Sequence, residues 1–169
     1  GRQKQYAHWL KLSSVYTPQI VVNRHTELVG SEESSLRNAI KAGLQKPVKN
    51  ELALSVIKMS GDKVNVQYNA GSLKGNASLL IALIEKSATT KVERGENGGR
   101  TLSHVQIVTK LQSVSLKNGG NGNETIALPH AFIPEKWELI GFVQNTSDGE
   151  IIAAAKTAFP SAMSADAGK

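Results

Sequence analysis

Residues 52–68 read Leu-Ala-Leu-Ser-Val-Ile-Lys-Met-Ser-Gly-Asp-Lys-Val-Asn-Val-Gln-Tyr, and this stretch decides the fold of most of the chain. Apolar residues stand at every second position on both sides of the turn at 60–62. They are Leu52, Leu54, Val56, Val64, Val66 and Tyr68. Side chains alternate between the two faces of a β-strand, so this period predicts two antiparallel strands that each bury one face.

Further short strand patterns, separated by turns, continue to residue 160. A Gly-rich turn is expected at 117–122, and Asp148–Gly149 indicates a second hairpin. Leu111 also suits a helix, so its segment is ambiguous from sequence alone. Repeated short strands predict an antiparallel β-sandwich. The expected strands are 78–85, 91–93, 104–116, 124–128, 137–144 and 150–159.

Before residue 46 the pattern is different. Residues 3–12 have a helical spacing, and 20–22 with 27–29 predict a small hairpin. A second helix is expected over 31–45, with Ser31 as its N-cap. Its apolar stripe consists of Leu36, Ile40 and Leu44.

Pro47 cannot extend that helix, because it lacks a backbone N–H. We therefore divide the chain into residues 1–46, a linker at 47–50, a β-sandwich domain at 51–160 and a disordered tail at 161–169. The expected fold class is α+β.

Composition excludes several classes of function. The net charge is +6, but the 20 basic residues are dispersed and only 5% of the residues are aromatic, so no nucleic-acid surface is expected. The sequence contains no cysteine, which rules out a thiolate metal site or a thiol nucleophile in this chain. No apolar run is long enough to predict a membrane span. No metal, cofactor or catalytic residue is predicted.

The isolated polar residues give little evidence for a catalytic or metal site. The histidines at positions 8, 25, 104 and 130 do not have metal-ligand spacing. Ser103, His104 and Asp148 could formally make a triad, but no nucleophile-elbow pattern surrounds them. Trp9 and Trp137 are expected to be core or half-core residues.

Two segments carry a resemblance to a known family. Residues 14–23 read Ser-Val-Tyr-Thr-Pro-Gln-Ile-Val-Val-Asn, and residues 92–102 read Val-Glu-Arg-Gly-Glu-Asn-Gly-Gly-Arg-Thr-Leu. With these segments the chain resembles the C-terminal part of a family of exported bacterial proteins of unknown function, which are thioredoxin-like at the N-terminus and carry an added β-rich domain. The resemblance implies a partial thioredoxin-like fold of helix, hairpin and helix.

By this resemblance Pro18 is the cis-proline of the thioredoxin fold, and Tyr16, Thr17 and Pro18 line a substrate groove for a protein or peptide. The family's Cys-x-x-Cys segment would lie upstream of Gly1, so this missing N-terminal thioredoxin segment is the expected partner of residues 1–46. The resemblance also implies a periplasmic or secreted location. The chain itself would be a non-catalytic part of a parent that exchanges thiols and disulfides.

The competing hypothesis is a binding module. The loop at 94–101 could bind an anion through its backbone amides and two guanidinium groups. The alternative for this loop is a tight turn whose Arg94, Glu96 and Arg100 bond one another. In the binding-module hypothesis the β-sandwich recognises a protein or envelope ligand and the thioredoxin-like part is only a scaffold. The candidate loop residues are Arg94, Glu96, Asn97, Arg100 and Thr101.

Overall fold

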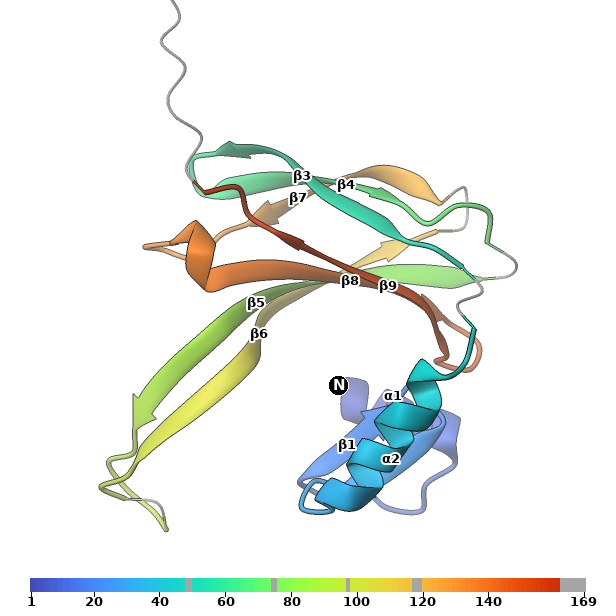
Figure 1. The fold of residues 1–169 in the computed structure, drawn as a ribbon, viewed down its shortest axis with the longest axis vertical. Helices are drawn as coiled ribbons and strands as arrows, with labels where there is room; N and C mark the ends of the chain where they lie inside the picture. The colour runs from blue at the N-terminus through green and yellow to red at the C-terminus, as the bar shows by residue number, and fades with distance from the viewer. Residues whose placement is uncertain (48–49, 74–75, 97, 117–119, 162–169) are drawn as a thin grey trace, which may run out of the picture.

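A computed structural model of the chain describes residues 1–47, 50–73, 76–96, 98–116 and 120–161 (Figure 1). Parts of the predicted linker, of the turn at 117–122 and of the loop at 94–101 fall outside these ranges, as does most of the predicted tail. The elements in chain order are α1 (Arg2–Leu10), β1 (Gln19–Val22), β2 (Thr26–Val29), α2 (Glu33–Leu44), β3 (Ala53–Ser60), β4 (Lys63–Asn69), β5 (Ala77–Lys91), β6 (Thr101–Ser115), β7 (Asn121–Ala127), a 3₁₀ turn η1 (Pro134–Lys136), β8 (Trp137–Asn145) and β9 (Ile151–Ala158).

Two antiparallel sheets pack face to face. One has the strand order β3-β4-β7 and the other β6-β5-β8-β9. At one side Gln112 on β6 donates a hydrogen bond of 2.6 Å to Glu124 on β7. The predicted hairpins β3–β4 and β8–β9 are both present.

The core lies between these sheets because alternate residues of each strand point inward. On β4 the residues Val64, Val66 and Tyr68 are buried while their neighbours are exposed, as the period of two predicts. The largest fully buried side chains are Leu79, Ile81, Leu83, Ile126, Leu139, Val64, Val66 and Val143.

β5 is longer than its apolar run. It continues through the mostly polar residues 86–91, so the predicted separate strand at 91–93 is wrong. The ambiguous segment around Leu111 is a strand, β6, which pairs with β5 over almost its whole length. Beyond Glu85, where the pairing with β8 stops, β5 and β6 project from the sandwich as a two-stranded ribbon (Figure 1).

Residues 1–46 contain α1, the two-stranded sheet β1–β2 and α2, which we call the N-terminal unit. Its elements occur in the predicted order of helix, hairpin and helix. The N-cap prediction for α2 is wrong: Glu32 holds that position, without a side-chain cap. The backbone has already turned at residues 29–32, where Glu32 N–H donates to the Val29 carbonyl, and this turn places Ser31 outside the helix.

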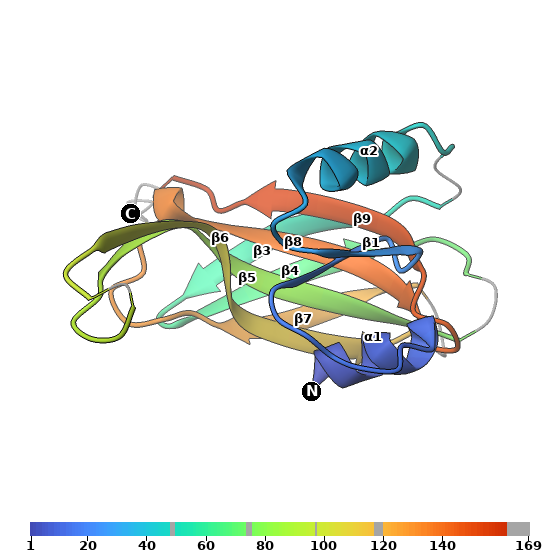
Figure 2. The same cartoon turned by 90° about the horizontal axis from the view of Figure 1, so that it is seen from below.

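The N-terminal unit lies against the four-stranded sheet near the β8–β9 turn (Figures 1 and 2). Gln144, the buried polar residue of β8, donates to the Tyr6 hydroxyl at 2.9 Å and to the Gly149 carbonyl at 2.8 Å. Trp9 packs edge-to-face with Tyr6 and covers Gly149 so closely that a Cβ there would overlap the indole ring. Trp9 is therefore an interface residue, and Gly149 is required by this contact and by its φ of +82°.

The first prediction concerns this contact. A left-handed φ alone costs a non-glycine residue about 1–2 kcal/mol, and overpacking adds about 1–3 kcal/mol. We expect Gly149→Ala to destabilise the protein through both effects. Gly61 has a φ of +57° and lies in open space, so Gly61→Ala should destabilise it only through the first. Thermal or denaturant unfolding measures the difference.

A Trp9→Ala background provides the control. Removing the indole should reduce the cost of Gly149→Ala to that of Gly61→Ala. An unchanged cost on this background would show that Trp9 does not constrain Gly149.

Candidate functional site

The Tyr16–Thr17–Pro18 segment lies between α1 and β1, and backbone and side-chain contacts fix it. The Thr17–Pro18 peptide bond is cis. Gly30 N–H donates to the Pro18 carbonyl at 2.8 Å, and a Cβ on Gly30 would lie 2.9 Å from the Pro18 Cβ. Gln3 donates to the Tyr16 carbonyl at 3.0 Å. Thr17 and Pro18 themselves are exposed, so their surface is accessible.

The Tyr16 side chain is held from the opposite strand. Its hydroxyl donates to the Glu27 carboxylate, which also accepts a 3.0 Å hydrogen bond from Gln19. The bond to Glu27 is the main cause that raises the pKa of Tyr16, with desolvation and the Glu27 charge adding to it. The same bond, with the one from Gln19, lowers the pKa of Glu27. Residues 16–18 are therefore one fixed corner of the N-terminal unit.

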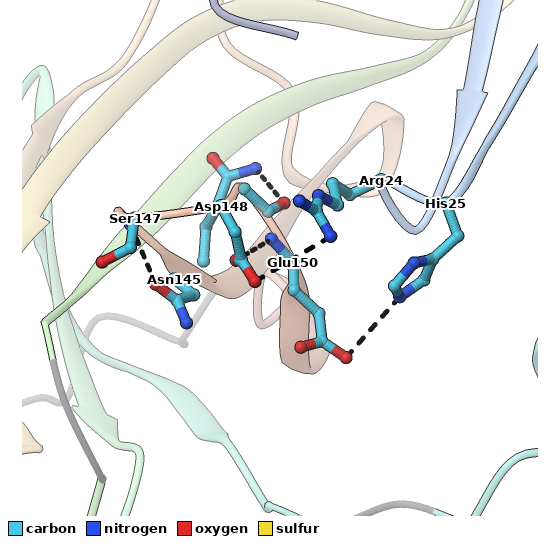
Figure 3. Close-up of polar contacts among 8 residues, drawn as sticks. Arg24, His25, Asn145, Ser147, Asp148 and Glu150 are labelled. Carbon is cyan, nitrogen blue, oxygen red and sulfur yellow. Dashed lines mark hydrogen bonds and ion pairs between the residues drawn. The ribbon is translucent and has the colours of Figure 1, made fainter. Parts of the chain in front are cut away.

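A second polar cluster joins the β1–β2 turn to the β8–β9 turn (Figure 3). Arg24 lies 3.9 Å from the Asp148 carboxylate, and His25 lies 3.7 Å from that of Glu150. Asp148 also accepts the Glu150 backbone N–H at 3.0 Å, and Asn145 accepts that of Ser147 at 2.9 Å. The side chains thus brace both turns and orient the β1–β2 turn on the sandwich.

The loop at 94–101 lies at the tip of the β5–β6 ribbon, and Asn97 is outside the described residues. Its turn is closed by backbone bonds, from Val92 N–H to the Arg100 carbonyl and from Gly99 N–H to the Val92 carbonyl. Thr101 starts β6. Arg94, Glu96 and Arg100 are exposed, and no ion pair joins them within the described part of the loop. The mutual bonding considered for this turn is therefore not observed.

The remaining candidates do not assemble into a reactive centre. His104 lies on β6 opposite Ala88, whereas Asp148 pairs with Arg24, and no hydrogen bond connects His104 with Asp148 or Ser103 in the described ranges. Over the same ranges no three His, Asp or Glu residues converge in a way that could hold a metal ion. No described helix is long and apolar enough to cross a membrane.

A shallow hollow of about 450 Å³ lies on the outer face of the β3-β4-β7 sheet. Its polar lining comes from Ser55, Gln67, Asn69, Asn121 and Asn123. Their side chains can donate and accept hydrogen bonds to a polar ligand.

Comparison with known proteins gives the family. The family described as "Protein of unknown function (DUF1223)" matches residues 1–144, which is most of the chain. The chain belongs to this family. The match spans the N-terminal unit and the sandwich as far as β8, so both parts of the structure are family features.

No curated protein matches the chain. Among solved structures it is similar to a domain of the outer membrane lipoprotein Omp28 from Porphyromonas gingivalis, with 14% identity and a TM-score of 0.44 over 68% of this chain and 99% of that one. It is also similar to a β-glucosidase from Kluyveromyces marxianus, with 18% identity and a TM-score of 0.30 over 66% of this chain and 14% of that one. A Bifidobacterium adolescentis GH3 β-glucosidase has 16% identity and a TM-score of 0.28 over 72% of this chain and 19% of that one. These likenesses establish no function.

The second prediction concerns the Tyr16–Glu27 pair. We expect Glu27→Ala to bring the pKa of Tyr16 back toward its ordinary value, because the main cause that raises it is removed. Since Glu27 has a lowered pKa when folded, its ionised form stabilises the protein above the unfolded-state pKa of Glu27, and this effect is lost as the pH falls through the folded-state value. Since Tyr16 has a raised pKa, its contribution is present below the unfolded-state pKa of Tyr16 and is lost as the pH rises through the folded-state value. An NMR titration of the Tyr16 ring and unfolding at several pH values measure both effects.

Glu32→Ala is the matched control, because Glu32 makes only the smallest of the contributions that raise the pKa of Tyr16. A Tyr16 titration that moves equally in both variants would show that the hydrogen bond to Glu27 does not control it.

Proposed function

We propose that residues 1–46 are the cis-proline half of a thioredoxin-like unit, and that the complete protein exchanges thiols and disulfides on protein or peptide substrates in the cell envelope. In this role Tyr16, Thr17 and Pro18 shape the substrate groove, while the β-sandwich carries and orients the unit. The reactive cysteines come from an upstream strand–helix segment, because this chain has none.

The observation that carries the proposal is the uncovered apolar stripe of α2. No residue of this twelve-residue helix is buried. Ile40 is 44% exposed and Leu44 is 82% exposed, although they continue the spacing that starts at Leu36. An isolated helix of this length is marginal in water, and so is a two-stranded sheet. An added strand–helix segment would cover this stripe and extend the β1–β2 sheet.

The fixed corner at residues 16–18 supports the same role. Contacts from Gly30 and Glu27 hold it from behind, so Thr17 and Pro18 keep an exposed surface on a rigid support. Pre-organisation of this kind lowers the entropic cost of binding an extended peptide. The envelope location rests on the resemblance to exported proteins.

The third prediction tests disulfide exchange. A gene product that contains the upstream Cys-x-x-Cys segment should reduce insulin disulfides in the presence of a thiol reductant, and Pro18→Ala should lower the rate because the groove loses its shape at Gly30. The turbidity of released insulin chains reports the rate. Absence of activity with both cysteines intact would refute the proposal.

Leu44→Lys provides a separate structural readout. In the present chain we expect no change in the thermal midpoint, because the side chain is already 82% exposed. In the gene product with the upstream segment the same change should lower the midpoint, whereas Lys41→Ala on the same helix should not.

A second candidate function, a binding module for an anionic protein or envelope ligand, is favoured by one observation. Arg94 and Arg100 are exposed at the tip of a projecting ribbon, and in the described part of this loop neither forms an ion pair with Glu96. Two guanidinium groups placed in this way can bind carboxylate or phosphate.

The fourth prediction tests this candidate. The double variant Arg94→Ala and Arg100→Ala should elute earlier than the parent chain from phosphate- and carboxylate-bearing resins. The double variant Lys58→Ala and Lys63→Ala removes the same charge from exposed positions on the β3–β4 hairpin. Equal shifts for the two double variants would show that only net charge matters, and would count against the loop.

A further inference from the structure

No described strand covers the β6 edge of the β5–β6 ribbon. β8 pairs with β5 only as far as Glu85, whereas β6 follows β5 to Lys91. β6 has fifteen residues and is the first strand in the sheet order β6-β5-β8-β9, so β5 is its neighbour on one side and no described strand of this sheet lies on the other. Such an edge presents unpaired backbone N–H and C=O groups, which are a template for another extended chain.

The ribbon bends toward the side of the sheet on which the N-terminal unit lies (Figure 1). Two irregularities in β6 mark the bend. Gln106 has a φ of +54°, and Thr109 is an extra residue between the pairs formed by Val108 and Lys110, with its hydroxyl donating to the Leu83 carbonyl at 3.1 Å. Bulges of this kind bend a strand and re-aim its side chains.

On one face of β6, apolar side chains lie beside buried apolar side chains of β5. Leu111 lies opposite Ala82 and Val108 opposite Ile84, and antiparallel partners point to the same face. Ala82 and Ile84 are buried but do not belong to the core between the two sheets, so they lie on the opposite face of the sheet, the side on which Figure 1 shows the N-terminal unit. On the same face Val108 is 56% exposed and Leu111 is 38% exposed. Val108 and Leu111, which we call the apolar margin of β6, therefore extend the apolar face that Ala82 and Ile84 form.

We propose that an extended polypeptide segment binds along the free edge of β6 as an added strand, with its apolar side chains packed against Val108 and Leu111. Only an extended chain offers alternating N–H and C=O groups that can pair with those of the edge. Its side chains also have the spacing needed to pack against the apolar margin. This binding rests on the proposed function for its purpose, which is to supply a substrate for thiol–disulfide exchange. In that role the ribbon holds an unfolded substrate beside the unit that carries residues 16–18.

The fifth prediction uses the cysteine-free chain and dye-labelled, S-carboxymethylated insulin B chain as the extended probe. Fluorescence anisotropy should show binding, and Val108→Asp should weaken it about tenfold, the effect of losing the burial of one valine side chain. The control is Val105→Asp. Val105 is 74% exposed and lies opposite Ser87, on the other face of the ribbon, so its variant should bind normally.

A second probe separates strand addition from general hydrophobic adhesion. The same peptide with proline at alternate positions of its apolar segment lacks the N–H groups that pair with the edge, so it should not bind. Equal binding of both peptides, equal losses in the two variants, or no binding at all would overturn the proposal. If Val108→Asp fails to fold, judged by thermal unfolding, the near-isosteric Val108→Thr replaces it, with Val105→Thr as its control.

Sedimentation velocity without peptide provides the remaining test. A concentration-dependent dimer that Val108→Asp converts to monomer would show that a second copy occupies the margin, which also overturns the proposal. No cysteine takes part in peptide binding. A negative binding result therefore does not change the insulin-reduction result, and a negative insulin-reduction result does not change the binding result.

Discussion

The structure depends on the burial of β5 on both of its faces. Leu79, Ile81 and Leu83 point into the sandwich core, while Leu80, Ala82 and Ile84 are buried on the opposite face. A strand buried on both sides has a continuous apolar sequence rather than an alternating one. One element therefore supports the core, the opposite face of the four-stranded sheet and the root of the projecting ribbon, so a substitution near residue 82 would disturb all three.

Sequence predicted the sandwich well because its strands carry strong local patterns. Alternation on β3 and β4 and the Asp148–Gly149 turn each act within a few residues, and both hairpins are present. The prediction was weaker where polar residues form strands. The distal part of β5 has no apolar period, and it is extended because β6 supplies its backbone partners. The residue type of Ser31 predicts a helix cap, but the preceding turn moves the helix start to residue 33.

The candidate groove was predicted only through a family resemblance, and its supporting contacts had no sequence signal. Nothing in the spacing of Tyr16 and Glu27 indicates a hydrogen bond, because their pairing follows from the return of β2 beside β1. The brace between the N-terminal unit and the sandwich is similar. Arg24 and Asp148 are separated by most of the chain, and neither residue type nor local pattern could join them before the two turns were placed together.

The energetics of this brace determine how firmly residues 16–18 are placed relative to the ribbon. The Arg24–Asp148 ion pair and the His25–Glu150 contact are long and partly exposed, and such surface pairs contribute at most about 1 kcal/mol each. Gln144 is different because it is buried, and losing a partner there leaves a desolvated amide that costs about 1–3 kcal/mol. Trp9 on Gly149 adds apolar burial at the same place. The N-terminal unit is thus anchored near one end of β8, at Tyr6, Trp9, Gln144 and Gly149, while charged groups only orient its turn. Small rotations about this anchor would change the distance between residues 16–18 and β6 without breaking the core.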